Sequence, residues 1–108
     1  MSFIDLSAQS EKTIFDGFFA RFVHTDQITI AYVRIEEGKH LPPHSHPQEQ
    51  ITTVISGELE MTVGEETQVL KEGQVGVIPS NVVHSGKALT PCYVIDVFNP
   101  VREDFKKL

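Results

Sequence analysis

Three histidines and one glutamine are the residues of this chain whose types and spacing fit a metal site. His44 and His46 are two positions apart, and residues i and i+2 of a β-strand point to the same face. Gln50 has the same parity if that strand continues, whereas His84 would have to arrive from a distant strand. Imidazole nitrogens and amide oxygens suit borderline divalent ions. These four residues are therefore candidate ligands of one divalent metal ion.

A His-x-His pair alone is a weak signal, because polar strand faces also carry histidines that bind nothing. Two further histidines need an interpretation. His24 follows a short apolar run and is expected at the surface. His40 shares the parity of His44 and is expected to line the mouth of a cavity rather than to bind metal.

The elements that would carry these residues are short strands. From residue 13 onward, β-rich runs alternate with turn residues, and no stretch shows convincing helical periodicity. Strands are predicted over 18–23, 28–35, 50–55, 58–63, 68–70, 75–78, 82–85 and 92–98. Many short strands in one small domain predict a sandwich or a closed barrel.

Length and composition limit the classes of protein to consider. A chain of 108 residues fits a single domain, with an arm or edge strand over 1–12, the barrel over 13–100 and a tail over 101–108. The net charge of -6 argues against nucleic acid as a partner, because phosphate binding needs a basic face. Cys92 is the one cysteine, so no intrachain disulfide is expected. Without a signal-peptide pattern or a membrane span, we expect a cytoplasmic protein with no membrane partner.

The frame of glycines and prolines around the candidate ligands resembles the two motifs of the cupin superfamily. The first motif is matched by Gly38, five residues, His44-x-His46, three residues, Gln50, six residues and Gly57. The second is matched by Gly73, five residues, Pro79-x-Asn81, two residues and His84. Fifteen residues separate the motifs, as is typical of small single-domain cupins. The resemblance implies an all-β fold, the double-stranded β-helix or jelly-roll barrel, with the metal inside.

The chain departs from the general motifs at two positions. Gln50 stands where the first motif usually has Glu, and Asn81 stands where the second usually has Gly. Glutamine can still bind a metal through its carbonyl oxygen, and it leaves the site more positive, which favours Lewis-acid chemistry over redox tuning. Asparagine is the next most tolerant residue for a positive φ, so the turn is expected to form.

Two longer segments narrow the resemblance to the KdgF-like cupins of pectin degradation, which linearise unsaturated uronic acids. The segments are HSHPQEQITTVISGELEMTVGEE, over 44–66, and DVFNPVREDF, over 96–105. In that subgroup three histidines and one glutamine hold the metal, which implies His44, His46, Gln50 and His84 as ligands here. The subgroup also uses an Asp, a Phe and an Arg near the last strand, which implies Asp96, Phe98 and Arg102 as catalytic residues. The subgroup's Ser-Pro-Pro-Arg is replaced by 99–102, Asn-Pro-Val-Arg.

The residues themselves allow two interpretations of this last set. Asp96 and Phe98 share a strand face, and an aspartate inside an apolar barrel needs either a partner or a task. Asp96 could act in proton transfer, or it could be a structural residue paired with Arg102 or Arg34. Arg102 could grip a carboxylate in a bidentate fork, or it could face solvent in a charged tail.

The resemblance implies a metal-dependent enzyme of carbohydrate metabolism that opens 4,5-unsaturated uronates to linear 4-deoxy-5-keto uronates. Its cofactor would be one divalent ion, with Zn, Ni, Mn and Fe all acceptable, and its partner a uronate or another small carboxylic acid or sugar. Two alternatives stay open: an Fe(II)-dependent cupin dioxygenase and a non-enzymatic sugar-binding cupin. Small cupins usually pair, so we also expect a homodimer, to which Phe3 and Ile4 could donate a strand.

Overall fold

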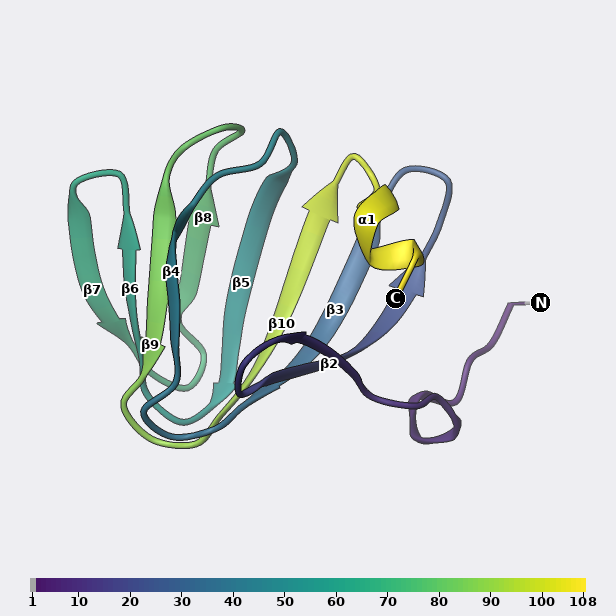
Figure 1. Cartoon of the computed structure of the whole chain (residues 1–108), viewed down its shortest axis with the longest axis horizontal. Coiled ribbons are helices and arrows are strands. Elements are labelled where there is room, and N and C mark those ends of the chain that lie inside the picture. Colours follow the sequence, from purple (N-terminus) through teal and green to yellow (C-terminus); the bar gives the residue numbers. More distant parts are fainter. Residues whose placement is uncertain (1) are drawn as a thin grey trace.

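The chain folds into two antiparallel β-sheets that face each other (Figure 1). The computed structural model describes residues 2–108; Met1, part of the predicted N-terminal arm, lies outside the described residues. One sheet has six strands in the order β1-β2-β3-β10-β5-β8 and the other has four in the order β4-β9-β6-β7. The strands are β1 (Lys12–Phe15), β2 (Phe18–His24), β3 (Thr29–Ile35), β4 (His40–His44), β5 (Glu49–Ser56), β6 (Leu59–Val63), β7 (Glu66–Leu70), β8 (Val75–Ile78), β9 (His84–Ala88) and β10 (Cys92–Asn99).

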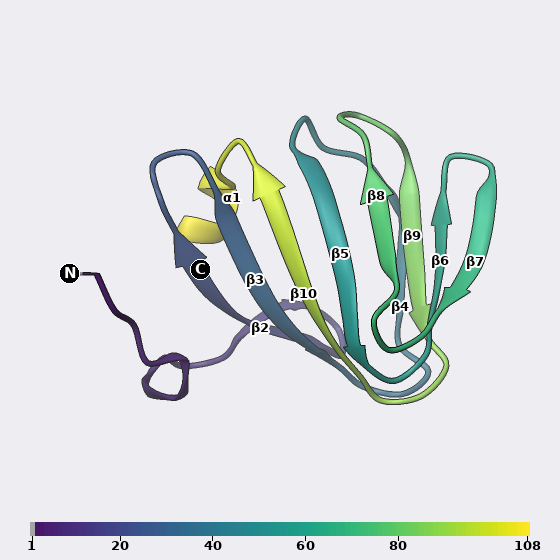
Figure 2. The same ribbon diagram turned by 180° about the vertical axis from the view of Figure 1, so that it is seen from behind.

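The eight strands from β3 to β10 have jelly-roll connectivity. β3 pairs with β10, and β4 pairs with β9 in the opposite sheet. β5 and β8 continue the first sheet, while β6 and β7 continue the second. Such winding brings strands that are distant in sequence together around one interior. The predicted all-β, single-domain jelly-roll fold is confirmed, and Figure 2 shows the sheets from behind.

The core lies between the sheets and is built by strict alternation. Along β5, Gln50, Thr52 and Val54 point inward, whereas Ile51 and Ile55 are exposed. Burying one face of each strand removes apolar side chains from water, which stabilises the fold by about 25 cal/mol per Å² of apolar surface. The interior is apolar in most places, and the buried polar residues Gln50, Thr52 and His84 gather at one cavity.

Four strands differ from the predictions by two residues or more. β1 was not among the predicted strands, and β7 begins at Glu66, two residues earlier than predicted. β4 was not predicted because Pro42 and Pro43 interrupt it, and prolines donate no ladder hydrogen bonds; β4 is tolerated as an edge strand of the four-stranded sheet. β9 was predicted over 82–85 but runs from His84 to Ala88, because the turn at Asn81, with a φ of 65°, delays its start.

The two ends of the chain behave differently. An N-terminal arm with a short 3-10 turn, η1 (Leu6–Ala8), leads away from the barrel (Figures 1 and 2). The C-terminal helix α1 (Glu103–Lys106) folds back on the barrel, and Phe105 packs against Phe22 and Phe98 with ring centroids 5.0 and 5.6 Å away. Within residues 2–108, no helix has the length and apolar character needed to cross a membrane.

Candidate metal centre

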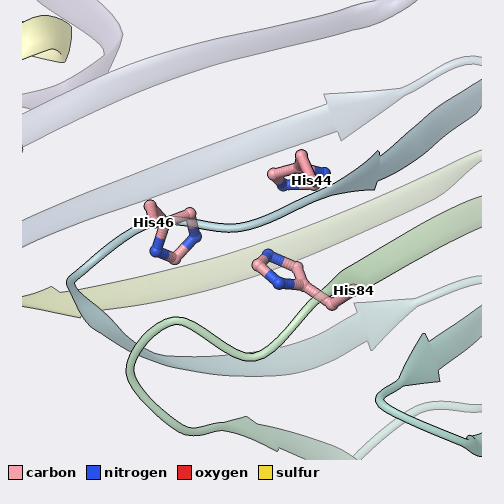
Figure 3. Close-up of side chains that lie close together, drawn as sticks. All are labelled: His44, His46 and His84. Carbon is pink, nitrogen blue, oxygen red and sulfur yellow. The ribbon is translucent and has the colours of Figure 1, made fainter.

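Three of the predicted ligands meet at one end of the barrel. The ligand nitrogens of His44, His46 and His84 all lie within 4.8 Å of one another, and Figure 3 shows the three rings gathered at one point. The ring centroids of His44 and His84 are 4.2 Å apart, and those of His46 and His84 are 4.8 Å apart. This separation suits three imidazoles that share one ion.

The two sheets and one loop bring these side chains together. His44 ends β4, His84 begins β9, and the two are direct partners in the four-stranded sheet. His46 lies in the loop between β4 and β5 rather than in a strand. The predicted convergence of His44 and His46 is therefore produced by a turn and not by strand parity. Gln50 reaches the site from β5 in the opposite sheet.

The backbone sets which nitrogen of each histidine faces the site. The Nδ1 atoms of His44, His46 and His84 lie 2.8, 2.9 and 2.9 Å from the carbonyl oxygens of residues 42, 48 and 82. A carbonyl only accepts, so Nδ1 carries the hydrogen in each ring, and Nε2 keeps its lone pair. Metal-binding histidines are usually oriented in this way, by a hydrogen bond from the ring nitrogen that does not bind the metal.

The nitrogens that remain fit a metal ion. The Nε2 atom of His84 is buried and has no hydrogen-bond partner among residues 2–108, although an unpaired buried polar atom is costly. Burial lowers the pKa of His84 to about 4, and it also lowers that of His46, where Arg102 acts in the same direction. Both imidazoles are thus neutral at pH 7, which is the form that binds metal.

Gln50 is aimed at the same point. It is buried, and its Oε1 lies 3.0 Å from Nε2 of His46. Both atoms are acceptors in the tautomer described above, so their approach is favourable only with a positive charge beside them. The arrangement of three lone-pair nitrogens and one carbonyl oxygen is what a borderline divalent ion requires.

Asp96 and Thr52 lie deeper in the barrel, on neighbouring strands. They are direct partners in the pairing of β10 with β5, and the Thr52 hydroxyl donates to Oδ1 of Asp96 over 2.6 Å. Burial raises the pKa of Asp96 to about 6, against the polar side chains of Thr52 and Gln50 and the charge of Arg102, which lower it. Arg34, one of the two predicted structural partners, instead pairs with Glu11 on the outer surface.

Arg102 does not face solvent: its side chain is 12% exposed. Its guanidinium stacks on Phe98 and Phe105, at 4.8 and 3.8 Å from the ring centroids. Nε and Nη2 form a fork with the carboxylate of Asp104, at 3.0 and 2.8 Å. Arg102 therefore keeps a fixed orientation, but this edge of the guanidinium is already paired within the chain.

One cavity of about 180 Å³ connects all of these groups. Its polar side is lined by the three histidines, Gln50, Thr52, Asp96 and Arg102. Its other side is apolar and includes Phe98, Leu59, Met61 and Val94. This volume is below the roughly 300–1,000 Å³ typical of drug-sized ligands, so the cavity fits a small molecule.

Some residues differ from their predicted places. His40 is exposed and lies outside the cavity, so its predicted position at the mouth is wrong; an irregularity between Leu41 and His44 shifts the strand and breaks the parity. His24 is half-buried, with Nδ1 2.8 Å from the Thr29 hydroxyl. Thr52 and Phe105 were not predicted as site residues, although the inward parity of Thr52 with Gln50 was a usable signal.

Comparisons with known proteins agree with this geometry. Residues 31–98 match the family model described as Cupin domain. A pectin degradation protein, KdgF, of Dickeya dadantii is 31% identical over 83 residues, which cover 75% of this chain and 76% of that protein. The solved structure of KdgF from Halomonas sp. has 29% identity and a TM-score of 0.91, covering 97% of this chain and 98% of that chain. An RmlC-like cupin from Shewanella frigidimarina has a TM-score of 0.92 at 24% identity, covering 97% and 96% of the two chains.

Proposed function

This chain belongs to the cupin domain family and is KdgF-like, and on this premise we propose that it is a metal-dependent uronate ring-opening enzyme. Its substrates would be the 4,5-unsaturated uronic acids released in polyuronate breakdown, such as that of pectin or alginate. The observation that carries the proposal is that Asp96 lines the same small cavity as the three histidines and Gln50. A candidate proton-transfer group and a candidate metal site thus line the same cavity.

The proposed ligands of the metal are His44, His46, Gln50 and His84. A divalent ion held there would supply Lewis-acid polarisation of a substrate oxygen near the anomeric carbon. Zn, Ni, Mn and Fe are all candidates, and elemental analysis of the purified protein would identify the ion. Imidazole and amide ligands bring no negative charge, so a bound ion would keep its full charge for this purpose.

Asp96 is the proposed general acid/base. The net reaction moves one proton: the anomeric hydroxyl loses it, the bond from the anomeric carbon to the ring oxygen breaks, and C4 of the resulting enolate gains it. The product is the linear 4-deoxy-5-keto uronate, an isomer of the substrate. A pKa of about 6 leaves Asp96 able both to take and to return this proton near neutral pH.

Arg102 and Phe98 are proposed to hold the substrate. Arg102 lines the cavity with a guanidinium fixed between two aromatic rings, and its donors that do not face Asp104 remain for a substrate carboxylate. Phe98 lies beside His46, with ring centroids 5.6 Å apart. There it would pack on the sugar and keep water out.

The test follows the ultraviolet absorbance of the enol ether that is conjugated to the uronate carboxylate. Metal-loaded protein should remove it faster than spontaneous opening does, and Asp96→Asn should lower kcat by at least about 100-fold, as expected for a general acid/base. Thr90→Val, which lies outside the cavity lining, is the control and should leave the rate unchanged. A rate with metal-loaded protein equal to the spontaneous rate would refute the proposal. Oxygen uptake with Fe(II) would favour a dioxygenase instead, and binding without turnover would favour a sugar-binding cupin.

We also propose that the protein is a homodimer and that it is cytoplasmic. Phe3 on the N-terminal arm is 90% exposed. The outer surface of the six-stranded sheet also exposes Ile51 and Val77, which are direct partners on β5 and β8. Adjacent exposed apolar side chains are typical of protein contacts. Sedimentation of the parent chain should give twice the monomer mass. Val77→Lys should shift the measured mass toward that of a monomer, and a monomeric parent chain would contradict the dimer. Imaging of a tagged chain would test the location.

A further inference from the structure

A chain of two hydrogen bonds joins Asp96 to Gln50 through the hydroxyl of Thr52. Thr52 Oγ1 donates to Oδ1 of Asp96 over 2.6 Å, and Nε2 of Gln50 donates to the same hydroxyl oxygen over 2.9 Å. Thr52 is 1% exposed and faces inward with Gln50 on β5, directly opposite Asp96 on β10. The three side chains form one polar network inside an apolar interior.

The donors and acceptors of this network fix its direction. An ionised carboxylate can only accept, so it takes the single hydroxyl hydrogen of Thr52. Toward Gln50 the Thr52 oxygen can then only accept, and only the amide nitrogen of Gln50 can donate to it. The carbonyl oxygen of Gln50 must therefore point the other way, toward His46.

This orientation matters because the two ends of an amide differ as ligands. The carbonyl oxygen can bind a cation, whereas the NH₂ group has no available lone pair. A reversed Gln50 amide would place two N–H groups beside the lone pairs of the histidines and would exclude a metal ion. Glutamate at the same position would have no such problem, because both of its terminal atoms are oxygens.

We propose that Thr52, held by Asp96, is a positioning residue that keeps the carbonyl oxygen of Gln50 turned toward the three histidines. The proposal rests on the proposed metal centre, with Gln50 as a ligand, but not on the substrate. It gives Asp96 a second task, in metal affinity as well as in proton transfer. Residues outside the ligand set that orient ligands in this way typically contribute about 10–100-fold to metal affinity.

The experiment measures the affinity of the purified chain for Co²⁺ alone, by calorimetry and by the visible absorption bands of the bound ion. Thr52→Val keeps the shape and removes the hydroxyl, and it should weaken Co²⁺ binding by about 10–100-fold. Thr52→Ser restores the hydroxyl and should stay within about threefold of the parent. Thr90→Val is the matched control: it removes a hydroxyl that accepts a hydrogen bond from the backbone of Glu58, outside the cavity.

A double-mutant cycle separates positioning from a purely structural role. In a Gln50→Glu background either end can bind the ion, so adding Thr52→Val should change Co²⁺ affinity by less than about threefold, a coupling that such cycles measure. Equal weakening in both backgrounds, or full affinity of Thr52→Val alone, would overturn the proposal. If Thr52→Val does not fold, Thr52→Ala takes its place in both arms. Because no uronate is used, failure of the ring-opening assay leaves this result unaffected, whereas a parent chain that binds no Co²⁺ removes both.

Discussion

At the scale of single residues, the hydrogen-bond partners of the polar side chains determine which of their atoms can face the candidate metal site. Each histidine of the triad uses Nδ1 on a main-chain carbonyl within two residues of itself. Local backbone therefore sets the tautomer before any metal binds, and little reorganisation remains to be done. Asp96 is different, because no cation forms an ion pair with it among residues 2–108. Its charge is stabilised by the network with Thr52 and Gln50 and, without a direct contact, by the charge of Arg102.

Asp96 should make the fold less stable as the pH rises. Its pKa is raised from 3.8 in the unfolded chain to about 6 in the folded one, so the folded state binds the proton more tightly. Its contribution to stability is most favourable below about pH 4 and is lost as the pH rises through 6. Asparagine does not titrate, so the Asp96→Asn variant does not lose stability in this way. The difference in free energy of unfolding, variant minus parent, should therefore rise by up to about 3 kcal/mol between pH 4 and 7.

Urea unfolding of the metal-free proteins across this pH range measures the difference. His84, whose lowered pKa gives the opposite dependence, is present in both chains and cancels. A difference that stays constant from pH 4 to 7 would show that Asp96 titrates normally in the folded state.

The contribution of Arg102 to the free energy of unfolding should come more from its stacking on aromatic rings than from its salt bridge. Asp104, its ion-pair partner, is 61% exposed, and exposed pairs contribute about 0.2–1 kcal/mol. The stacking between Phe98 and Phe105 is shielded from water and depends on a planar guanidinium. Arg102→Lys should therefore lower the unfolding free energy more than Asp104→Asn does. Thermal unfolding checks the order, and equal losses would assign the effect to the ion pair.

At the scale of elements, turns decide where the candidate ligands lie. Asn81 adopts a φ of 65°, as its place in the second motif predicted, and its N–H donates to the carbonyl of His46 over 2.9 Å. The turn before β9 thus supports the loop that carries His46. The same turn explains why β9 begins two residues later than predicted.

The sequence predicted the barrel and the three histidines that gather at the candidate metal site, but not every element that holds them. Short β-rich runs between turn residues identified β3, β5 and β10. Residues 42 and 43, both proline, hid β4, and the irregularity after Leu41 made the parity argument fail for His40. Parity placed Thr52 on the same face as Gln50, but its contact with Asp96 depends on the pairing of β5 with β10, which the sequence does not give.

Two glycines with positive φ should respond differently to alanine. Gly57 and Gly38 have φ values of 89° and 80°, so both variants carry the strain of a left-handed side chain, about 1–2 kcal/mol. A Cβ at Gly57 would also lie 2.2 Å from the carbonyl oxygen of Pro91, whereas one at Gly38 would have no atom within 4 Å. Gly57→Ala should therefore reduce the unfolding free energy clearly more than Gly38→Ala, as chemical denaturation would measure. Similar losses would mean that the backbone near Pro91 moves aside easily.

At the scale of the whole molecule, the candidate metal site lies between the two sheets. His44 and His84 belong to the four-stranded sheet, and Gln50 belongs to the six-stranded sheet. An ion bound by all of them would link the sheets at one end of the barrel. The link would add to the packing of the apolar core and would act on strands that are distant in sequence.

Metal binding should therefore protect both sheets and not only the strands that carry histidines. An ion at 100 times its dissociation constant adds about 2.7 kcal/mol to the unfolding free energy, which for a domain of this size raises Tm by roughly 10–20 °C. Hydrogen exchange should slow at β4 and β9 and equally at β5. In the Gln50→Leu variant, which still has the three histidines, the slowing at β5 should shrink while that at β4 and β9 persists. Protection confined to the four-stranded sheet in the parent chain would show that Gln50 is not a ligand and that the ion does not join the two halves of the barrel.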